Sequence, residues 1–227
     1  MRYTVYADIN CPFCFALNER FNAMGLVDEV DWRPIQHAPD ITSARYSFES
    51  LSELTAEVME VRRRVPALNI VTPPFRPGTA LASELITEAA VIAPRLASRL
   101  RTLMYQALWR FGQDISDPEI TAKLLAQAGI NNLVVSDNSR QKLDTWQQEW
   151  QDGGFERNIP VTLSSGGSSL IGLPVQVEQN SFFSHDTDMD ITLPAICSMA
   201  PIQKILLLDQ SREDIRCFIE QMGKYDI

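Results

Sequence analysis

The feature that most constrains the fold of this chain is a strand, a dithiol and a helix that follow one another directly. Residues 3–8 are rich in Tyr, Thr and Val, which predicts a short strand. Cys11 and Cys14 come next in the order Cys-Pro-Phe-Cys, and residues 12–24 are predicted to form a helix. We therefore expect Cys11 near a helix N-terminus, where unpaired N–H groups and the helix dipole favour an anion.

This placement predicts a reactive thiol at Cys11. The thiolate is the reactive form of cysteine, and a helix N-terminus lowers the pKa of a thiol. Pro12 suits the first helical position, where its missing N–H loses no hydrogen bond. Cys14 is expected on the next turn, close enough to form a disulfide with Cys11. We interpret the pair as a redox-active dithiol, with half of a zinc site or two inert core thiols as the alternatives.

A zinc site is the weaker alternative because zinc needs about four ligands, usually cysteine or histidine. The remaining candidates are scattered along the chain and form no second close pair: Cys197, Cys217, His37 and His185. We therefore predict no metal. Cys197 and Cys217 are interpreted as structural. His37, which follows the second strand, could approach the site, but the favoured interpretation is a loop histidine without a role.

The rest of the chain predicts a sheet interrupted by a long helical block. Residues 29–35 predict a second strand, parallel to the first through a helical crossover that ends at Gly25. Thr79 is the expected N-cap of one of the helices. The remaining predicted segments are helices over 49–65, 79–92, 94–111, 118–129 and 138–151, followed by strands over 159–163 and 168–171.

Three features together resemble the DsbA-like branch of the thioredoxin-fold thiol-disulfide oxidoreductases, which includes FrnE-type proteins and 2-hydroxychromene-2-carboxylate isomerases. They are the strand–Cys-Pro-Phe-Cys–helix start, the helical block, and Ile159-Pro160 directly before an apolar strand. The resemblance covers residues 1–183 and implies an α/β class, a thioredoxin fold with an inserted all-helical domain. Residues 1–47 and 154–183 would form the thioredoxin-like domain, and residues 48–153 the insertion.

The resemblance also implies the site. Cys11 and Cys14 would be catalytic, and the substrate would bind against Pro12, Phe13, Ile159 and Pro160. The Ile159 backbone would pair with an extended substrate chain, and Pro160, after a cis bond, would lie against the sulfurs. Phe13 cannot donate a hydrogen bond, unlike the histidine that DsbA proteins carry there. We therefore expect a less depressed Cys11 pKa than in those proteins.

Other residues near the predicted site have two interpretations each. Asp8 is either a proton shuttle for Cys14 or a strand-end residue that caps the loop. Residues 73–77, Pro-Pro-Phe-Arg-Pro, are expected to break a helix rather than to contact substrate. Three tryptophans are expected to pack in the core: Trp109, Trp146 and Trp150.

The C-terminal fifth of the chain differs from the rest. Residues 184–200 predict an acidic linker. Residues 201–227 predict a β-α segment that resembles the start of a receiver domain. Gln210 stands where such domains have a second acid, which argues against metal binding and phosphorylation there. The alternative is a tail that packs on the preceding domain.

Composition narrows the function. The formal charge of −9 disfavours nucleic acid and anionic membranes as partners, and no apolar run reaches the ~20 residues of a membrane span. The absence of a signal sequence and the use of only four cysteines predict a cytoplasmic protein. We predict a thiol-disulfide oxidoreductase that acts on protein or small-molecule thiols and disulfides. It would need no cofactor, with glutathione as a candidate redox partner.

Two alternatives remain for the function. One is a glutathione-dependent isomerase or transferase of the same fold, although relatives of that kind typically carry serine in place of the dithiol. The other is a non-catalytic redox-sensing module of a larger signalling protein, which the acidic linker and the receiver-like tail suggest.

Overall fold

The computed structural model describes residues 2–39 and 48–173, with side chains described from residue 51 in the second range. The predicted linker at 184–200 and the predicted segment at 201–227 lie outside the described residues, together with His185, Cys197 and Cys217.

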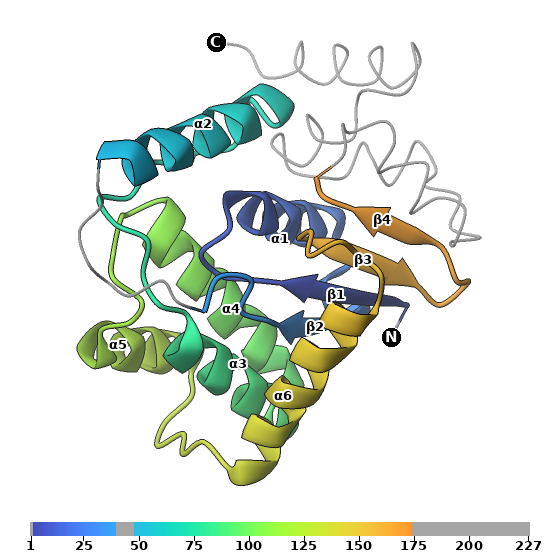
Figure 1. Ribbon diagram of the computed structural model, residues 1–227. Helices are drawn as coiled ribbons and strands as arrows, with labels where there is room; N and C mark the ends of the chain where they lie inside the picture. The colour runs from blue at the N-terminus through green and yellow to red at the C-terminus, as the bar shows by residue number, and fades with distance from the viewer. Residues whose placement is uncertain (1, 40–47, 174–227) are drawn as a thin grey trace, which may run out of the picture.

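The described residues form a four-stranded mixed sheet in the order β2-β1-β3-β4 (Figure 1). β1 pairs in parallel with β2 and antiparallel with β3, and β4 is antiparallel to β3. The strands are β1 (Tyr3–Ala7), β2 (Val30–Pro34), β3 (Val161–Ser164) and β4 (Ser169–Ile171).

Helix α1 connects β1 to β2, and the described residues between β2 and β3 contain five further helices. The bounds follow the predicted segments closely, and the division of the chain into two domains stays a prediction. The helices are α1 (Pro12–Met24), α2 (Phe48–Arg64), α3 (Ala80–Ile92), α4 (Pro94–Trp109), α5 (Pro118–Ala128) and α6 (Asp137–Asp152), with a short 3-10 helix at Val27–Glu29.

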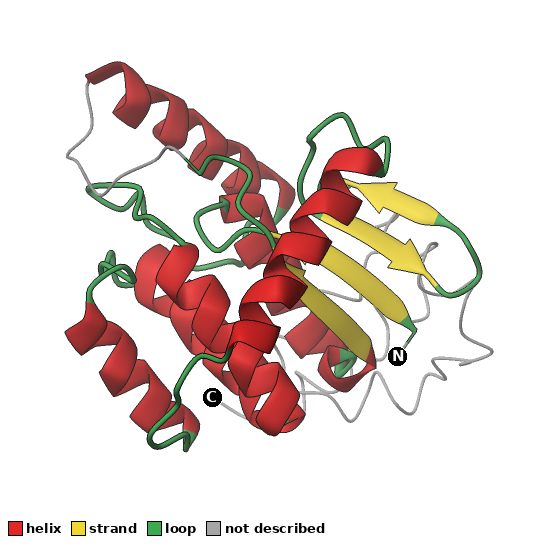
Figure 2. Ribbon diagram, turned by 60° about the horizontal axis from the view of Figure 1, so that its bottom comes forward, coloured by secondary structure: helices red, strands yellow, loops and turns green. Residues whose placement is uncertain are grey.

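The sheet has a core on each face. The side chains of β1 alternate between faces, as a strand requires, so Tyr3, Val5 and Ala7 join the larger core and Tyr6 the smaller one. The larger core also contains buried residues of α1, α3 and α4. On the other face α6 lies across the sheet, as Figure 2 shows, and packs Trp146 and Trp150 against it. The predicted core positions of these two tryptophans are confirmed.

Two of the predicted signals for helix ends have different outcomes. Gly25 adopts a left-handed conformation (φ 69°) and closes α1 by donating to the carbonyls of Phe21 and Asn22, as predicted. Thr79 precedes α3, but its side chain makes no capping hydrogen bond. Its ψ of 1° departs from the extended conformation that a capping side chain needs, and the residue is buried.

Candidate active site

The dithiol lies at the start of α1, as the sequence predicts. Cys11 is the N-cap residue, with an extended backbone (φ −104°, ψ 121°), and Pro12 occupies the first turn. Neither Cys11 nor Cys14 is in a disulfide. Both are buried, but Cys11 retains 5% of its surface whereas Cys14 retains none. Of the two residues, Cys11 is therefore the more accessible.

The environment moves the pKa values of the two thiols in opposite directions. Burial raises the pKa of Cys11, but hydrogen bonding from Cys14 and the positive charge of His37 outweigh it and leave the value lowered. Burial raises the pKa of Cys14 well above its ordinary value, and the hydrogen bond to Cys11 and the Cys11 charge act in the same direction. The arrangement favours a thiolate at Cys11 beside a protonated Cys14.

Helix α4 holds the loop that leads to the dithiol. The hydroxyl of Tyr105 donates to the carbonyl of Asp8 (3.1 Å), and Nε1 of Trp109 donates to the carbonyl of Ile9 (2.8 Å). Both side chains are fully buried. The two carbonyls lie beyond the end of β1, so these bonds replace the partners that a strand would supply. The predicted packing role of Trp109 is confirmed, while Tyr105 was not among the predicted site residues.

Asp8 uses both carboxylate oxygens. Oδ1 accepts from the Asn10 N–H (3.4 Å), and the Cys11 N–H donates to the Asp8 carbonyl (3.3 Å), which closes the turn before α1. Oδ2 accepts from the His37 N–H (3.0 Å) and lies 2.8 Å from Nδ1 of the His37 ring. The geometry contains the loop cap that the sequence suggested. Transfer of a proton from Cys14 to Asp8 stays a prediction.

His37 lies beside the site, which is the alternative that the sequence interpretation considered but did not favour. Its side chain is 23% exposed and contacts the fully buried carboxylate of Asp8. Burial lowers the pKa of His37, but the hydrogen bond and charge of Asp8, with the charge of Cys11, leave the value raised. A signal for this contact was present, because β1 and β2 are parallel and residues that follow parallel strands meet at one edge of the sheet.

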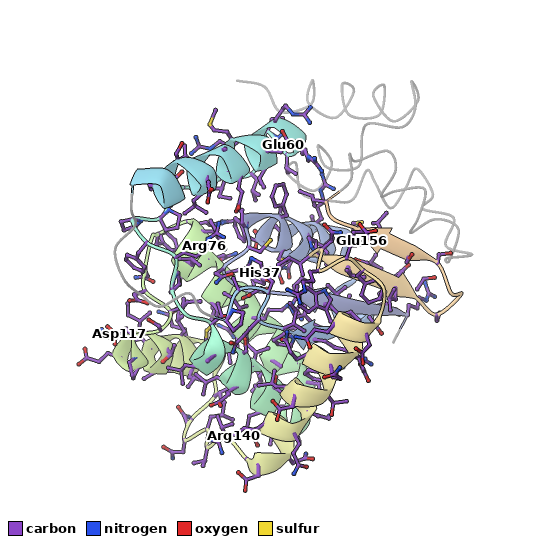
Figure 3. All side chains as sticks on the ribbon, in the orientation of Figure 1. His37, Glu60, Arg76, Asp117, Arg140 and Glu156 are labelled. Atoms are coloured by element: carbon purple, nitrogen blue, oxygen red, sulfur yellow. The ribbon has the colours of Figure 1, made fainter. Side chains whose placement is uncertain are left out.

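The proline-rich segment at 73–77 brings a second charge to this edge. Arg76 Nη2 lies 2.6 Å from Oε2 of Glu57 on α2. Burial lowers the pKa of His37, and the Arg76 charge acts in the same direction. Burial raises the pKa of Cys11, and the Glu57 charge acts in the same direction. Figure 3 shows Arg76 and His37 near the start of α1. The segment breaks the helical pattern as predicted, and it also contributes to the electrostatics of the site.

The Ile159–Pro160 peptide bond is cis. Pro160 is buried and Ile159 is half-buried directly before β3, whose first residue, Val161, pairs with Tyr6. Continued by two positions, this antiparallel register places Ile159 opposite Asp8, at the edge of the sheet that carries the dithiol. Within the described chain no residue hydrogen-bonds to the Ile159 backbone. The predicted substrate-binding roles of these residues remain predictions.

Phe13, the third residue of the dithiol segment, is half-buried and covered by α2. The guanidinium carbon of Arg64 lies 5.7 Å from the centre of the Phe13 ring. Arg64 is fixed by Oε1 of Glu60 (2.6 Å) and by the carbonyl of Leu173. The last turn of α2 therefore forms one wall beside the dithiol.

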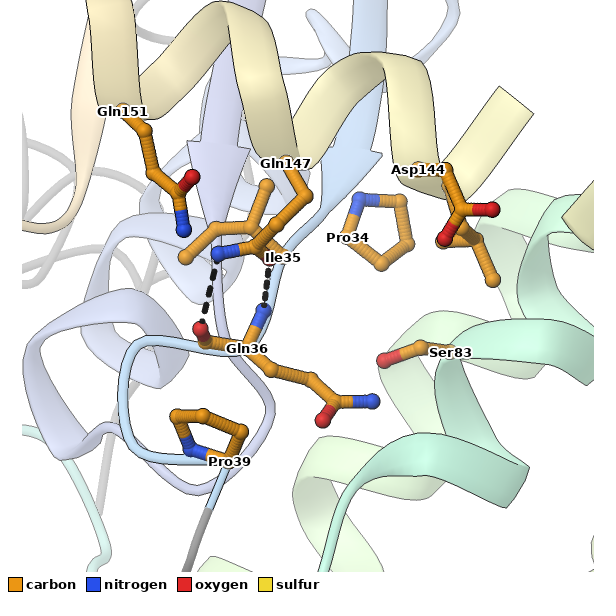
Figure 4. A pocket seen from close by; sticks show the side chains of 9 residues that line it. Pro34, Ile35, Gln36, Pro39, Ser83, Asp144, Gln147 and Gln151 are labelled. Atoms are coloured by element: carbon orange, nitrogen blue, oxygen red, sulfur yellow. Dashed lines mark hydrogen bonds between the residues drawn. The ribbon is translucent and has the colours of Figure 1, made fainter. Parts of the chain in front are cut away.

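A separate pocket of about 230 Å³ is lined in part by Gln36, the residue before His37 (Figure 4). Two hydrogen bonds join Gln36 to Gln147 of α6: the Gln36 N–H donates to Oε1 (2.8 Å), and Nε2 donates to the Gln36 carbonyl (3.1 Å). Pro39 and the buried Ser83 also line this pocket. These bonds anchor the loop after β2 to α6, and so support the position of His37.

The described residues contain neither a metal site nor a helix that could cross a membrane. Among residues 2–39 and 48–173, no three His, Cys, Asp or Glu side chains are arranged to hold a metal ion. No helix in the same residues has the length and apolar character to cross a membrane.

Comparison with known proteins agrees with the topology. The family model of the DSBA-like thioredoxin domain matches residues 4–153. The structure is similar to a probable DsbA oxidoreductase from Streptomyces coelicolor, with a TM-score of 0.64, 15% identity and coverage of 82% of this chain and 89% of that chain. It is also similar to a 2-hydroxychromene-2-carboxylate isomerase, with a TM-score of 0.62, 13% identity and coverage of 82% and 95%.

A third similar structure is the cytosolic disulfide reductase DsbM from Pseudomonas aeruginosa, solved with GSH. The TM-score is 0.54 at 10% identity, with coverage of 75% of this chain and 89% of that chain. The comparison with curated proteins finds no match. The family match spans well over half of the sequence. The chain therefore belongs to the family of DSBA-like thioredoxin domains and has their α/β fold.

Proposed function

We propose that this protein is a thiol-disulfide oxidoreductase in which Cys11 is the attacking thiol and Cys14 the resolving thiol. The observation that carries the proposal is the difference between the two sulfurs. Cys11 caps a helix, keeps a small exposed surface and has a lowered pKa, whereas Cys14 is fully buried with a raised pKa. An exchange reaction needs one ready thiolate and one thiol held in reserve.

In the proposed reaction the Cys11 thiolate attacks one sulfur of a substrate disulfide. A bond forms between Cys11 and that sulfur, the substrate S–S bond breaks, and the other substrate sulfur leaves as a thiolate. Cys14 then loses its proton, with Asp8 as the proposed acceptor, and attacks the sulfur of Cys11. The mixed disulfide breaks, the second substrate thiolate leaves, and two electrons have passed from the dithiol to the substrate.

The raised pKa of Cys14 controls the order of these steps. Besides burial, its causes are the hydrogen bond to Cys11 and the negative charge of Cys11. Both disappear when Cys11 enters the mixed disulfide, so Cys14 becomes easier to deprotonate at the step where it must attack. Pro12, Phe13, Ile159 and Pro160 are the proposed contacts for the substrate chain.

The proposed partners are protein or small-molecule disulfides, with glutathione as the reductant that regenerates the dithiol. Two molecules of glutathione would be oxidised to one glutathione disulfide in each cycle. A similar solved structure, that of DsbM, contains GSH, which supports this partner. The proposed chemistry needs no metal or organic cofactor, and the proposed compartment is the cytoplasm.

The decisive experiment is a redox titration of the dithiol against glutathione, followed by alkylation and mass spectrometry. A Cys197→Ser/Cys217→Ser background removes the other two thiols from the count. We expect a reversible two-electron transition that is lost in Cys11→Ser. Cys14→Ser should instead accumulate a mixed disulfide with glutathione at Cys11. A pair that stays fully reduced or fully blocked at every ratio of reduced to oxidised glutathione would contradict the proposal.

The similarity to an isomerase structure supplies the second arm of this test. An isomerase of that kind uses glutathione without net oxidation. Turnover of a 2-hydroxychromene-2-carboxylate that persists in Cys14→Ser, together with no redox transition of the dithiol, would favour that activity over disulfide exchange.

A further inference from the structure

The topology of the sheet brings His37 to the dithiol. β1 and β2 are parallel and in register, with Ala7 opposite Pro34, and the Ile35 N–H donates to the Ala7 carbonyl (3.0 Å). The carboxyl ends of the two strands therefore coincide. The loop after β1 carries Cys11, and the loop after β2 carries His37, so one edge of the sheet presents both groups.

The contact between His37 and Asp8 fixes the ring. Oδ2 of Asp8 accepts from the His37 N–H and lies 2.8 Å from Nδ1 of the ring, so backbone and side chain hold to the same oxygen. The Asp8 carboxylate is fully buried and the ring is 23% exposed. A buried carboxylate at this distance favours the imidazolium form, because no other cation is hydrogen-bonded to it within the described residues.

The Cys-Pro-Phe-Cys segment contains no cation, and its hydrogen bonds to Cys11 come from Cys14. Phe13 provides no donor, and Pro12 has no N–H. Cys11 follows Asp8 by a single turn, closed by the Cys11 N–H and the Asp8 carbonyl (3.3 Å). His37 and Cys11 each shift the pKa of the other. The charge of His37 lowers the pKa of Cys11 against the effect of burial. The Cys11 thiolate, together with Asp8, raises the pKa of His37.

Other charged or titratable groups at this edge oppose or balance the pair. Glu57 of α2 and Arg76 of the segment before α3 form an ion pair with each other (2.6 Å), so their effects on Cys11 and His37 partly cancel. Tyr105 of α4 donates to the Asp8 carbonyl and is neutral, since burial raises its pKa well above the ordinary value. Cys14 is protonated when Cys11 is the thiolate.

We propose that His37 is a positioning residue of the dithiol: Asp8 holds its ring as a cation beside Cys11, and this cation stabilises the Cys11 thiolate. The loop after β2 thereby supplies the charge that the Cys-Pro-Phe-Cys segment itself lacks. This inference rests on the proposed function, and it adds a residue that sets the reactivity and the reduction potential of the dithiol.

The first test compares His37→Asn with His37→Lys in the background without Cys197 and Cys217. The rate of Cys11 alkylation by iodoacetamide is measured from pH 4 to 10, with the thiolate absorbance as a second signal. At pH 6 we expect the rate in His37→Asn to fall by about tenfold, the smaller end of what an opposite charge at close range produces. His37→Lys should recover part of this loss.

A matched control changes the opposite charge. Glu57→Gln removes a carboxylate that acts to raise the Cys11 pKa and frees the Arg76 cation that pairs with it. We expect alkylation of this variant at pH 6 to be faster than that of the parent protein. A variant whose fold is merely loosened would not produce effects of opposite sign at these two positions. An unchanged pH profile in His37→Asn would overturn the proposal.

The reciprocal test follows His37 itself. The chain has two histidines, so its NMR titration shows two ring signals, which His37→Asn assigns. We expect the His37 pKa to be higher in the reduced protein than in the disulfide form or in Cys11→Ser, because the thiolate is present only in the first. Equal values in all three would overturn the inference even if the dithiol remains redox-active. Absence of redox activity would instead count against the proposed function.

The reduction potential gives an independent signal. A stabilised thiolate favours the reduced form, so His37→Asn should have a more negative potential than the parent protein, and His37→Lys should lie between them. An unchanged potential, with both variants folded by circular dichroism, would contradict the proposed role.

Discussion

The first turns of α1 and α5 are built alike but serve different purposes. Both helices begin with an N-cap residue followed by proline, Cys11-Pro12 and Asp117-Pro118, and both end on a glycine with positive φ. The side chain of the cap makes the difference. The Asp117 carboxylate accepts from the N–H of Glu119 (2.8 Å), whereas Cys11 makes no capping hydrogen bond.

The comparison shows how one local design serves either stability or chemistry. At α5 a permanent carboxylate satisfies a free N–H and interacts favourably with the helix dipole, so the effect is a contribution to folding. At α1 the same position holds a group that changes both its charge and its covalent state. There the field of the helix, with the charge of His37, acts on the ionisation of a thiol.

The largest expected effect comes from placing serine at both caps. Cys11→Ser should abolish disulfide exchange because a hydroxyl does not replace a thiolate as a nucleophile. Asp117→Ser should leave exchange at the level of the parent protein, since serine is also a good N-cap and α5 carries none of the proposed site residues. The measurement is reduction of a model disulfide with glutathione as electron donor. Loss of exchange in Asp117→Ser would show that the two helix starts are not independent.

The second prediction tests whether the start of α1 depends on distant residues. Trp109→Phe removes the bond to the Ile9 carbonyl and leaves a small cavity, with an expected loss of ~3 kcal/mol of unfolding free energy. The rate of Cys11 alkylation should change as well, because the loop before α1 loses a fixed point. Urea denaturation and alkylation measure the two effects.

Trp146→Phe is the matched control for that variant. Trp146 is also buried, but it lies in the core on the other face of the sheet and has no hydrogen bond to the loop before α1. We expect some loss of stability and no change in alkylation. If both variants change alkylation equally, the effect of Trp109 is a general loosening of the fold.

The third prediction concerns the pH dependence that the Cys11 cap of α1 adds to the stability of the fold. The Cys11 pKa is lowered in the fold, so between that value and the ~8.5 of an unfolded cysteine the unfolded state binds more protons. Within that window the stability of the reduced protein, relative to Cys11→Ser, should rise with pH by up to ~1.4 kcal/mol per unit. The stabilisation from Cys11 is therefore fully present above ~8.5 and is lost as the pH falls through the folded pKa. Urea denaturation of both proteins under reducing conditions measures the difference.

Above ~8.5 the sign reverses for Cys14, whose pKa is raised in the fold by burial and by Cys11. There the unfolded thiol ionises while the folded one does not, so stability falls as the pH rises. A Cys14→Ser variant should lack this fall. A pH profile of the reduced protein that is identical to that of Cys11→Ser at all values would contradict the lowered pKa of Cys11.

Short-range signals were sufficient to predict most of the helices and strands. The N-cap and proline pairs at residues 11–12 and 117–118, together with the glycines at 25 and 129, act within one turn of the chain, and the observed helices begin and end there. The dithiol and the cis Ile159–Pro160 bond were expected from a local pattern combined with the family resemblance. Thr79 shows the limit of such signals, because residue type alone does not determine ψ.

The parts of the site that the sequence analysis missed are long-range. Tyr105 and Trp109 donate to carbonyls 97 and 100 residues earlier in the chain, and no spacing rule predicts which buried donor meets which loop. His37 is an intermediate case. The predicted parallel pairing of β1 and β2 was enough to place the residues that follow them side by side, so the contact with Asp8 was within reach of the sequence.

The smallest expected effect is that of Asp117→Ala. Loss of a carboxylate N-cap removes the bond to the Glu119 N–H and should lower the unfolding free energy by ~1 kcal/mol. Because this charge is far from the dithiol in sequence and belongs to another helix, the alkylation profile of Cys11 should be unchanged. Urea denaturation and alkylation across pH test both statements. If stability falls by this amount and the profile of Cys11 stays fixed, the two N-termini act separately, and the reactivity of Cys11 comes from groups at its own end of the sheet. A shifted profile would mean that α5 is coupled to the dithiol through α4, and the contrast between a structural and a chemical cap would then need revision.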